Sequence, residues 1–289
     1  MKHITRIAPA PTGMMHLGTA RTALFNWLVA RSTEGKMILR IDDTDINRNS
    51  VEAVKIIYDA MDWLGLDYDI TFKQSDRLEV YTELANTLVK NDLAFYDDKA
   101  IRLRMHDILN WTDTITGKYM VSDQEKSNMN DLCIMKSDGY PTYHFASIVD
   151  DIDYNVSWII RGVDHISNTP KQLAIAYALE QIGMKQFNPL WSHIGLITQN
   201  KKKLSKRDGA ASVLTYRDQG IDSDALCNWM LRLGWGPTID DKTTSMIDKN
   251  RALSLFLNGG KMRASPSNLD QMMLQSLDRK YKGMKKKNI

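Results

Sequence analysis

The amino-acid sequence predicts an α/β fold, in which a doubly wound parallel sheet is covered by helices and followed by a helical C-terminal region. Two observations predict the sheet. Short β-rich runs alternate with helical patterns over the first 64 residues, and the alternation resumes after residue 131. A third observation predicts the attached region, because helical patterns replace the strands from residue 222 onward.

The first part of the chain has the order strand, helix, strand, helix. A β-rich run at residues 3–8 ends in a turn-rich loop, and apolar residues at helical spacing follow over 19–31. Residues 36–41 predict a second strand. A second helix is expected over 51–64, and Ser50 before it is a suitable N-cap residue.

Polar turns interrupt the alternation over residues 97–131, which contain strand-like pieces at 101–105 and 118–122. We interpret this segment as an insertion. The remaining pattern predicts strands over 132–136, 156–160 and 190–194, an apolar segment over 142–149, and helices over 81–90, 168–181, 222–233, 251–257 and 268–281. We therefore expect four regions: a first half-domain (1–97), a short connective insertion (98–131), a second half-domain (132–215) and a helical region with a basic tail (216–289).

The composition is that of a soluble globular protein. Hydrophobic residues are 43% and charged residues 25% of the chain, which is normal for a protein with a packed core. No apolar run approaches the roughly 20 residues needed to span a bilayer, and the N-terminus lacks the apolar core of a signal peptide. We expect a cytoplasmic protein with no membrane association.

The charge and the cysteines limit the possible partners. The net charge of +3 is mild and does not by itself indicate a nucleic-acid partner. Two cysteines, far apart and without a CxxC pattern, argue against a zinc site. The C-terminal basic run is either a solvated, frayed end or a phosphate contact, and consists of Lys280, Lys282, Lys285, Lys286 and Lys287.

The loop after the first strand has the sequence PAPTGMMHLGT over residues 9–19. Parallel sheets bind ligands at this position, beyond the carboxyl end of a strand and at a helix N-terminus. Gly13 and Gly18 permit close approach of the backbone, and His16 can donate a hydrogen bond to a phosphate. Taken alone, a Pro/Gly turn with one histidine is usually only a turn.

A second polar loop has the sequence KLSKRDG over residues 203–209, preceded by two further lysines. Most such runs are exposed charge. The alternative is a mobile basic loop that holds a polyphosphate, where lysines neutralise the charge of a pyrophosphate leaving group. Neither GxGxxG after the first strand nor GxxxxGK[ST] is present, so dehydrogenases and P-loop enzymes have no support.

Together, the two loops resemble the HIGH-type and KMSKS-type motifs of class I aminoacyl-tRNA synthetases, here HLGT at 16–19 and KLSKR at 203–207. Further stretches resemble glutamyl-tRNA synthetase of the bacterial type: RIAP (6–9), ARTALFNW (20–27), LRIDDTD (39–45), DGYPTY (138–143), IRGVDH (160–165), KRDGA (206–210) and YRDQG (216–220). The resemblance covers nearly the whole chain.

The resemblance implies a Rossmann-like catalytic domain that activates L-glutamate with ATP and Mg²⁺ and transfers it to the 3′ end of tRNA. The catalytic residues would be His16, Lys203 and Lys206. ATP would contact Thr12, His16, Gly18, Thr19, Asp164, His193, Lys203, Leu204, Ser205, Lys206 and Arg207. Glutamate would contact Arg6, Ala8, Ala10, Asp42, Tyr143, Ser147 and Arg161, and the RNA 3′ end would lie near Thr44 and Asp45. The Arg161 fork would pair with the substrate's side-chain carboxylate, unless Arg161 is a plain surface arginine.

Several features depart from the family pattern. Ala10 replaces a usual serine, Ser147 a common asparagine, and Asp42 a frequent glutamate. The short insertion would bind the acceptor end and residues 216–289 would contact the tRNA stem, but no helical anticodon-binding domain follows. We expect a monomer that acts on the acceptor stem, with a separate anticodon-binding partner as one option.

Two alternatives stay open. The length resembles the truncated paralogue that glutamylates a queuosine base in tRNA. The chain could also be a degenerate synthetase that serves as a tRNA- or protein-binding module, although the intact lysine loop and His16 argue against this interpretation.

Overall fold

The centre of the molecule consists of parallel strands. The computed structural model describes residues 1–45, 48–104, 110–123, 126, 131–199, 202–203, 212–237 and 246–287. One parallel sheet has the order β1 (Ile4–Ile7), β2 (Lys36–Ile41), β3 (Ile70–Lys73), and a second contains the parallel pair β9 (Trp158–Gly162) and β10 (Leu190–Ile194). The sheets meet where the backbone N–H of Ser157 donates to the Ile4 carbonyl (2.9 Å). The predicted α/β class is confirmed.

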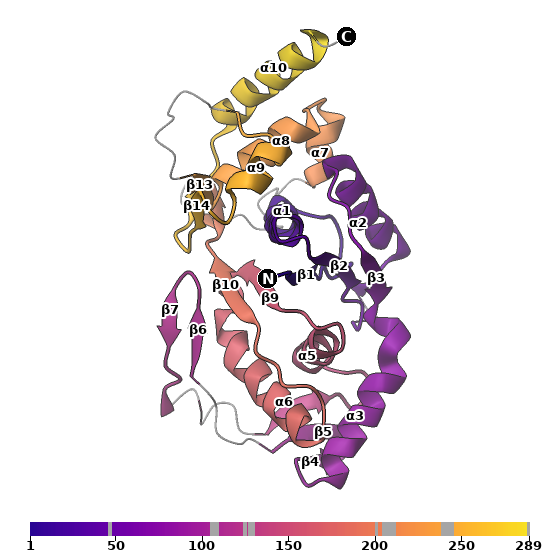
Figure 1. Ribbon diagram of the computed structural model, residues 1–289. Helices are drawn as coiled ribbons and strands as arrows, with labels where there is room; N and C mark the ends of the chain where they lie inside the picture. The colour runs from indigo at the N-terminus through magenta and orange to yellow at the C-terminus, as the bar shows by residue number, and fades with distance from the viewer. Residues whose placement is uncertain are drawn as a thin grey trace.

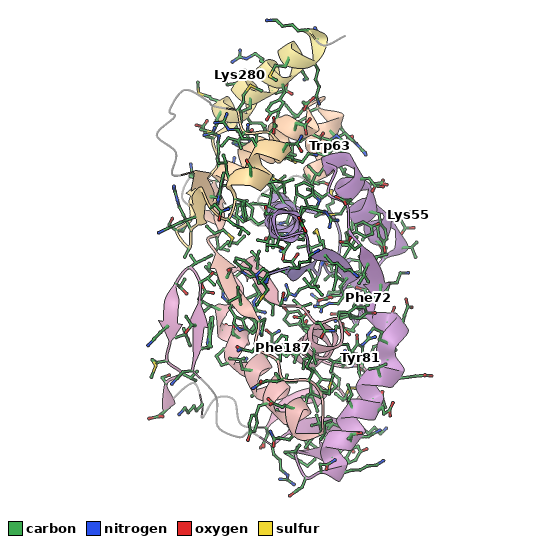
Figure 2. All side chains as sticks on the ribbon, viewed as in Figure 1. Lys55, Trp63, Phe72, Tyr81, Phe187 and Lys280 are labelled. Atoms are coloured by element: carbon green, nitrogen blue, oxygen red, sulfur yellow. The ribbon has the colours of Figure 1, made fainter. Side chains whose placement is uncertain are left out.

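Helices cover both sides of these strands (Figure 1). On one side lie α1 (Leu17–Ser32) and α2 (Val51–Leu64), and on the other lie α3 (Leu78–Lys90), α5 (Tyr143–Asp153) and α6 (Thr169–Gln181). The apolar segment expected at 142–149 is therefore part of a helix. Side chains fill the space between the layers (Figure 2) and form two main cores, one around α1 and one between α3, α5 and α6.

The starts of α1 and α2 follow from their capping residues. The Ser50 side chain accepts from the backbone N–H of Ala53 (3.0 Å), which confirms the expected cap, and α2 ends at Gly65 in the left-handed conformation. Helix α1 begins at Leu17, two residues before the predicted start. The imidazole of His16 accepts from the backbone N–H of Thr19 (3.3 Å) and serves as the cap there.

The segment expected to be an insertion divides between two sheets. Strands β4 (Ala94–Asp97), β5 (Ala100–Leu103) and β8 (Leu132–Met135) form an antiparallel sheet. The hairpin of β6 (Trp111–Asp113) and β7 (Gly117–Tyr119) instead joins the edge of β10, where Thr114 N–H donates to the Trp191 carbonyl (2.8 Å). The hairpin thus contacts the central sheet directly.

The C-terminal region packs against α1. It contains α7 (Val213–Asp218), α8 (Ser223–Arg232), β13 (Trp235–Pro237), α9 (Lys249–Leu255), β14 (Gly260–Met262), β15 (Ser267–Asn268) and α10 (Gln271–Lys287). Strand β13 follows α8 directly. Strand β11 (Ile197–Gln199) pairs with both β15 and β12 (Lys202–Lys203).

The basic run at the C-terminus is helical through Lys287, so the interpretation as a frayed end is wrong for these residues. Lys282 pairs with Asp278 (2.7 Å), and Lys285 pairs with Asp222 (2.7 Å) and Asp224 (3.0 Å). These contacts keep the last turns helical, while Lys280 projects from the outer side of α10 (Figure 2). None of the described helices is long and apolar enough to cross a membrane.

Candidate functional site

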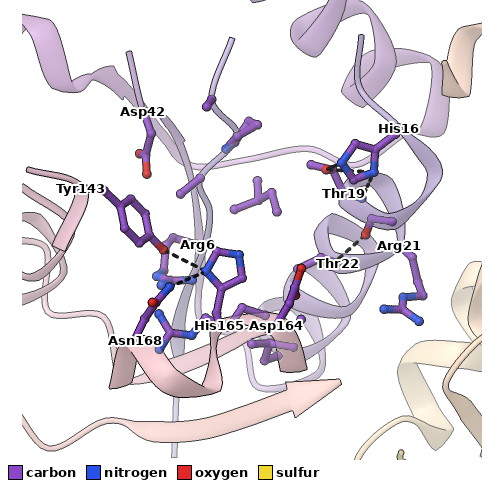
Figure 3. Close-up of a pocket in the computed structure, with 18 of the residues that line it drawn as sticks. Arg6, His16, Thr19, Arg21, Thr22, Asp42, Tyr143, Asp164, His165 and Asn168 are labelled. Atoms are coloured by element: carbon purple, nitrogen blue, oxygen red, sulfur yellow. Dashed lines mark hydrogen bonds between the residues drawn. The ribbon is translucent and has the colours of Figure 1, made fainter. Parts of the chain in front are cut away.

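A cavity of about 570 Å³ lies at the carboxyl ends of β1, β2 and β9, beside the N-terminus of α1 (Figure 3). Its walls contain these predicted site residues: Arg6, Ala8, Ala10, His16, Gly18, Thr19, Asp42, Thr44, Asp45, Tyr143, Arg161 and Asp164. Thr12 lines a smaller neighbouring cavity of about 150 Å³, which shares Ala10, His16 and Thr19 with the first. The loop after β1 and the ends of three strands therefore bring together residues that are far apart in the sequence.

The first turn of α1 presents polar groups to this cavity. His16 lies over the turn, with Nδ1 facing Thr19 N–H and Nε2 lying 3.2 Å from Thr19 Oγ1. A Cβ at Gly18 would lie 3.2 Å from His16 Nδ1, so glycine leaves room for the ring. The partial positive charge of the helix N-terminus makes this wall suitable for an anion.

Arg161 carries a buried charge without a carboxylate partner. Its side chain is buried (6% exposed), which excludes the interpretation as a surface arginine. It donates to His193 Nε2 (3.0 Å), Gln172 Oε1 (2.7 Å) and Thr169 Oγ1 (2.7 Å), and among the described residues no carboxylate lies within ion-pair distance. Burial lowers the pKa of Arg161 to about 10, so it stays charged at neutral pH. Such a cation at a cavity wall favours an anionic ligand.

Beneath the opposite wall lies a buried network of arginines and aspartates. Arg40 donates to Asp42 (2.7 Å) and to Asp151 (2.8 Å), and Arg6 donates to Asp151 (3.1 Å). Burial raises the pKa of Asp42 to about 6, although the neighbouring Arg40 pulls it downward. Asp42 therefore lines the cavity as a carboxylate that ionises near neutrality.

Two predicted site residues lie behind the walls. Ser147 is buried, and its Oγ accepts from Arg40 Nη2 (3.1 Å). His193 is fully buried and, among the described residues, is joined to the cavity wall by its hydrogen bond with Arg161. Their roles in binding stay predictions, as do those of the other site residues.

The lysine loop lies almost wholly outside the described residues. This holds for Leu204, Ser205, Lys206 and Arg207, and the side chain of Lys203 is likewise outside them. The backbone of Lys203 pairs with Thr198 across the β11–β12 ladder. Because β11 begins three residues after β10 ends, the loop starts near the strand that carries His193.

Several lining residues were not anticipated: Arg21, Thr22, Arg48, His165, Asn168, Leu196 and Ile197. Arg21 is buried and donates to the carbonyls of Gly195 and Leu233 (both 2.6 Å), so it links α1 to the turn after β10 and to the end of α8. The sequence signal that could have identified Arg21 is the presence of an arginine within an apolar helical run.

His165 is held as a neutral ring. Its Nδ1 lies 3.1 Å from Asn168 Nδ2 and 3.5 Å from the Tyr143 hydroxyl (Figure 3). Burial lowers the pKa of His165 to about 4, and the nearby charge of Arg161 acts in the same direction. With Asn168 donating to Nδ1, the ring proton lies on Nε2.

No group of three or more His, Cys, Asp or Glu side chains suited to a metal ion occurs within the described ranges. The expectation of no zinc site stays a prediction.

The fold and this cavity define the class of protein. Residues 2–101 and 99–265 match the family described as tRNA synthetases class I (E and Q), catalytic domain, and the chain belongs to this family. Within it, the resemblance to glutamyl-tRNA synthetase is confirmed by similarity to named relatives. The chain is 42% identical to the glutamate–tRNA ligase of Thermodesulfovibrio yellowstonii, over 80% of this chain and 56% of that protein.

Two further relatives agree. The glutamate–tRNA ligase of Francisella tularensis subsp. tularensis is 35% identical over 96% of this chain and 65% of its own length. The structure of a glutamate tRNA ligase from Elizabethkingia meningosepticum, in complex with its amino acid, superposes with a TM-score of 0.84 at 25% identity, over 97% of this chain and 70% of that one. The chain spans about half the length of the first of these curated relatives.

Proposed function

We propose that this chain activates L-glutamate with ATP and transfers the glutamyl group to the 3′ end of tRNA. The observation that carries the proposal is Arg161, a buried guanidinium with neutral partners at the wall of a 570 Å³ cavity. A fork of N–H donors matches a carboxylate in shape and charge. The neutral amide of glutamine would leave this buried charge uncompensated, so the site discriminates between the two amino acids.

The other cavity walls supply partners for the rest of the amino acid. Asp42, when ionised, would accept hydrogen bonds from the α-ammonium group. Arg6 and Tyr143 line the same cavity as Asp42 and Arg161, and the backbone atoms of the substrate would lie against them. Ala8 and Ala10 would contact the substrate through the backbone, since their side chains offer no hydrogen bond.

ATP would bind as its Mg²⁺ complex at the N-terminus of α1. His16, Gly18 and Thr19 form the wall there, and Thr12 and Asp164 border it. The carboxylate of glutamate attacks the α-phosphate and pyrophosphate leaves, so the reaction needs no protein nucleophile. Positive charge from the helix N-terminus, Lys203 and Lys206 would stabilise the departing pyrophosphate.

The acceptor would approach from the side of Thr44 and Asp45, which lie at the rim beside Asp42. The basic face of α10 would contact phosphates of the RNA stem. Because such contacts carry no sequence information, charging should discriminate weakly between tRNAs and depend strongly on salt. Action as a monomer, alone or with a separate anticodon-binding protein, belongs to this proposal.

The activation step is tested by amino-acid-dependent exchange between ATP and pyrophosphate, with and without bulk tRNA. We expect exchange with glutamate and at least about tenfold less with glutamine or aspartate, since each 1.4 kcal/mol of lost pairing gives a factor of ten. Absence of exchange with every amino acid would overturn the proposal and favour a binding module.

The acceptor is tested with tRNA that lacks its 3′-terminal adenosine. We expect this RNA to accept no glutamate, while intact tRNA is charged. Equal labelling of both RNAs would place glutamate on an internal base and support the alternative of base modification.

A further inference from the structure

The hairpin β6–β7 supplies a carboxylate behind the proposed specificity residue. Asp113, at the end of β6, is buried (1% exposed), and its Oδ2 accepts from His193 Nδ1 (2.7 Å) and from the backbone N–H of His193 (3.0 Å). Its Oδ1 accepts from the backbone N–H groups of Ile115 and Thr116 (2.8 and 2.9 Å). Both oxygens of Asp113 are therefore occupied by donors.

This arrangement determines which nitrogen of His193 carries the proton. An ionised carboxylate only accepts, so Nδ1 must be the protonated nitrogen. Burial lowers the pKa of His193 although Asp113 opposes the shift, which keeps the ring neutral and leaves Nε2 as an acceptor. Arg161 Nε donates to that acceptor at 3.0 Å. The hydrogen-bond polarity thus runs in one direction, from Arg161 through His193 to Asp113.

The rings around His193 limit its motion. Its imidazole packs edge-on against Trp111 of the same hairpin, with ring centroids 5.4 Å apart, and lies parallel to Trp191 at 6.4 Å. The Arg161 guanidinium lies over Trp191 at 5.2 Å from the ring centroid. With Nε held by His193, one terminal nitrogen by Gln172 and the other by Thr169, and with Tyr143 as a further hydrogen-bond partner, the Arg161 guanidinium is fixed from several sides.

We propose that Asp113 is a positioning residue for amino-acid specificity: through the tautomer of His193 it fixes the Arg161 guanidinium in the orientation that accepts a carboxylate and rejects an amide. The inference rests on the proposed function of Arg161. It also means that the hairpin of the connective segment takes part in the amino-acid site, although none of its described residues lines the cavity.

The test uses Asp113→Asn in the full chain. One carboxylate oxygen becomes an NH₂ group, which faces the backbone N–H groups of Ile115 and Thr116 in one orientation, and Nδ1 together with the backbone N–H of His193 in the other. Facing Nδ1, it moves the ring proton to Nε2 and places that N–H against the Nε–H of Arg161. We expect the ratio of kcat/KM for glutamate over glutamine in the exchange reaction to fall about 10- to 100-fold, by analogy with the loss seen when a metal-binding histidine loses its carboxylate partner. The change should lie in KM for glutamate and leave KM for ATP unaltered.

A matched control weakens the same contact between the β6–β7 hairpin and β10 without changing the histidine. Thr114→Val removes the hydrogen bond between Thr114 Oγ1 and Ser192 Oγ (2.6 Å), which also joins the hairpin to β10. We expect this variant to keep the preference for glutamate. An equal loss of the preference for glutamate in both variants would mean that only the packing of the hairpin against β10 matters. That result would overturn the inference.

The tautomer has a readout that does not depend on activity. In protein labelled with ¹⁵N-histidine, the His193 ring signals, assigned with His193→Gln, should show Nδ1 protonated and Nε2 bare in the wild type, and the reverse in Asp113→Asn. A wild-type ring protonated on Nε2 overturns the inference, and this measurement decides even where the asparagine variant does not fold. If the wild type shows no glutamate-specific exchange, the proposed function fails. If the wild type is specific and Asp113→Asn keeps that specificity, only the inference fails.

Discussion

Arg161 is a charged side chain in a low-dielectric interior, and its free energy falls when a carboxylate binds beside it. Burial without a counter-ion disfavours the charged form, which is why its pKa lies below that of an exposed arginine. The unliganded protein therefore holds an unfavourable charge in place by the hydrogen bonds from Arg161 to His193, Gln172 and Thr169. Under the proposed function, the preference for a carboxylate would follow from relief of that unfavourable state.

Replacing Arg161 with lysine keeps the positive charge but removes the planar guanidinium with its paired N–H donors. We expect kcat/KM for glutamate to fall about 100-fold, or roughly 3 kcal/mol of transition-state stabilisation, because an ammonium group makes no bidentate contact. ATP–pyrophosphate exchange measures the effect. Arg31→Lys is the matched control, because Arg31 pairs with Asp67 and Asp69 far from the cavity and should leave exchange intact. An Arg161→Lys variant with full activity would contradict the assignment of Arg161 to glutamate recognition.

The pH dependence of glutamate binding should reflect Asp42. Because burial raises the pKa of this carboxyl to about 6, it is ionised above that pH and can accept from the substrate ammonium, and it is neutral below. We expect kcat/KM for glutamate to fall about tenfold per pH unit below pH 6. Asp42→Asn should bind glutamate weakly at every pH and should not show this fall in kcat/KM below pH 6. A fall of the same size in the asparagine variant would mean that another group causes the pH dependence.

The resemblance to glutamyl-tRNA synthetase named many residues of the cavity wall, because the motifs that carry it at 6–19, 39–45, 138–143 and 160–165 are local stretches of sequence. It could not separate Ser147 and His193 from the wall residues, since their distance from the cavity depends on which face of a buried element they occupy. Arg21 was not predicted as a site residue. Its role depends on carbonyls at Gly195 and Leu233, which no local pattern connects to it.

Among the elements, α2 was predicted with both ends correct: Ser50 was expected as its N-cap, and the structure ends the helix before Gly65. The short strands β3, β4 and β6 were not predicted. Runs of three or four residues carry too little alternation, and their pairing partners decide whether they form. The attachment of β6 to β10 rests on tertiary contacts that no local pattern in the connective segment indicates. The region boundaries themselves stay a prediction.

The cap of α2 makes a measurable contribution to stability. Ser50→Ala removes the acceptor for the Ala53 N–H, and we expect the free energy of unfolding to fall by about 1 kcal/mol. Urea denaturation followed by circular dichroism measures this change. Ser50→Asp should keep the cap and lose little. A loss of equal size in both variants would mean that the hydroxyl serves another purpose.

At the scale of the whole molecule, α10 combines two kinds of lysine. Lys285 pairs with Asp222 and Asp224 and holds α10 to α8, while Lys286 and Lys287 are exposed on the last turn. The pattern of the sequence predicted the basic run but not this division, because the aspartates lie about sixty residues earlier. The structure thus places one lysine in ion pairs with α8 and leaves the last two exposed.

The two kinds of lysine should respond differently to substitution. In Lys286→Ala/Lys287→Ala we expect weaker tRNA binding and a shallower dependence of log K on log salt, by roughly 0.9 for each phosphate that the protein no longer neutralises. Filter binding over a salt series measures the slope. Lys285→Ala should mainly lower the melting temperature. An unchanged salt slope in the double variant would show that α10 does not touch the RNA backbone.

The position of β1 between β2 and β9 has a consequence for biosynthesis. Its partner β2 begins at Lys36, but Ser157, which covers its other edge, lies 153 residues after Ile4. At about 5–20 residues per second, the ribosome needs roughly 8–30 s to make that stretch, during which one edge of the nascent strand stays unpaired. An open strand edge can pair with a neighbouring chain. Translation that pauses between these two segments would therefore lower the yield of correctly folded protein, even though the finished molecule is unchanged.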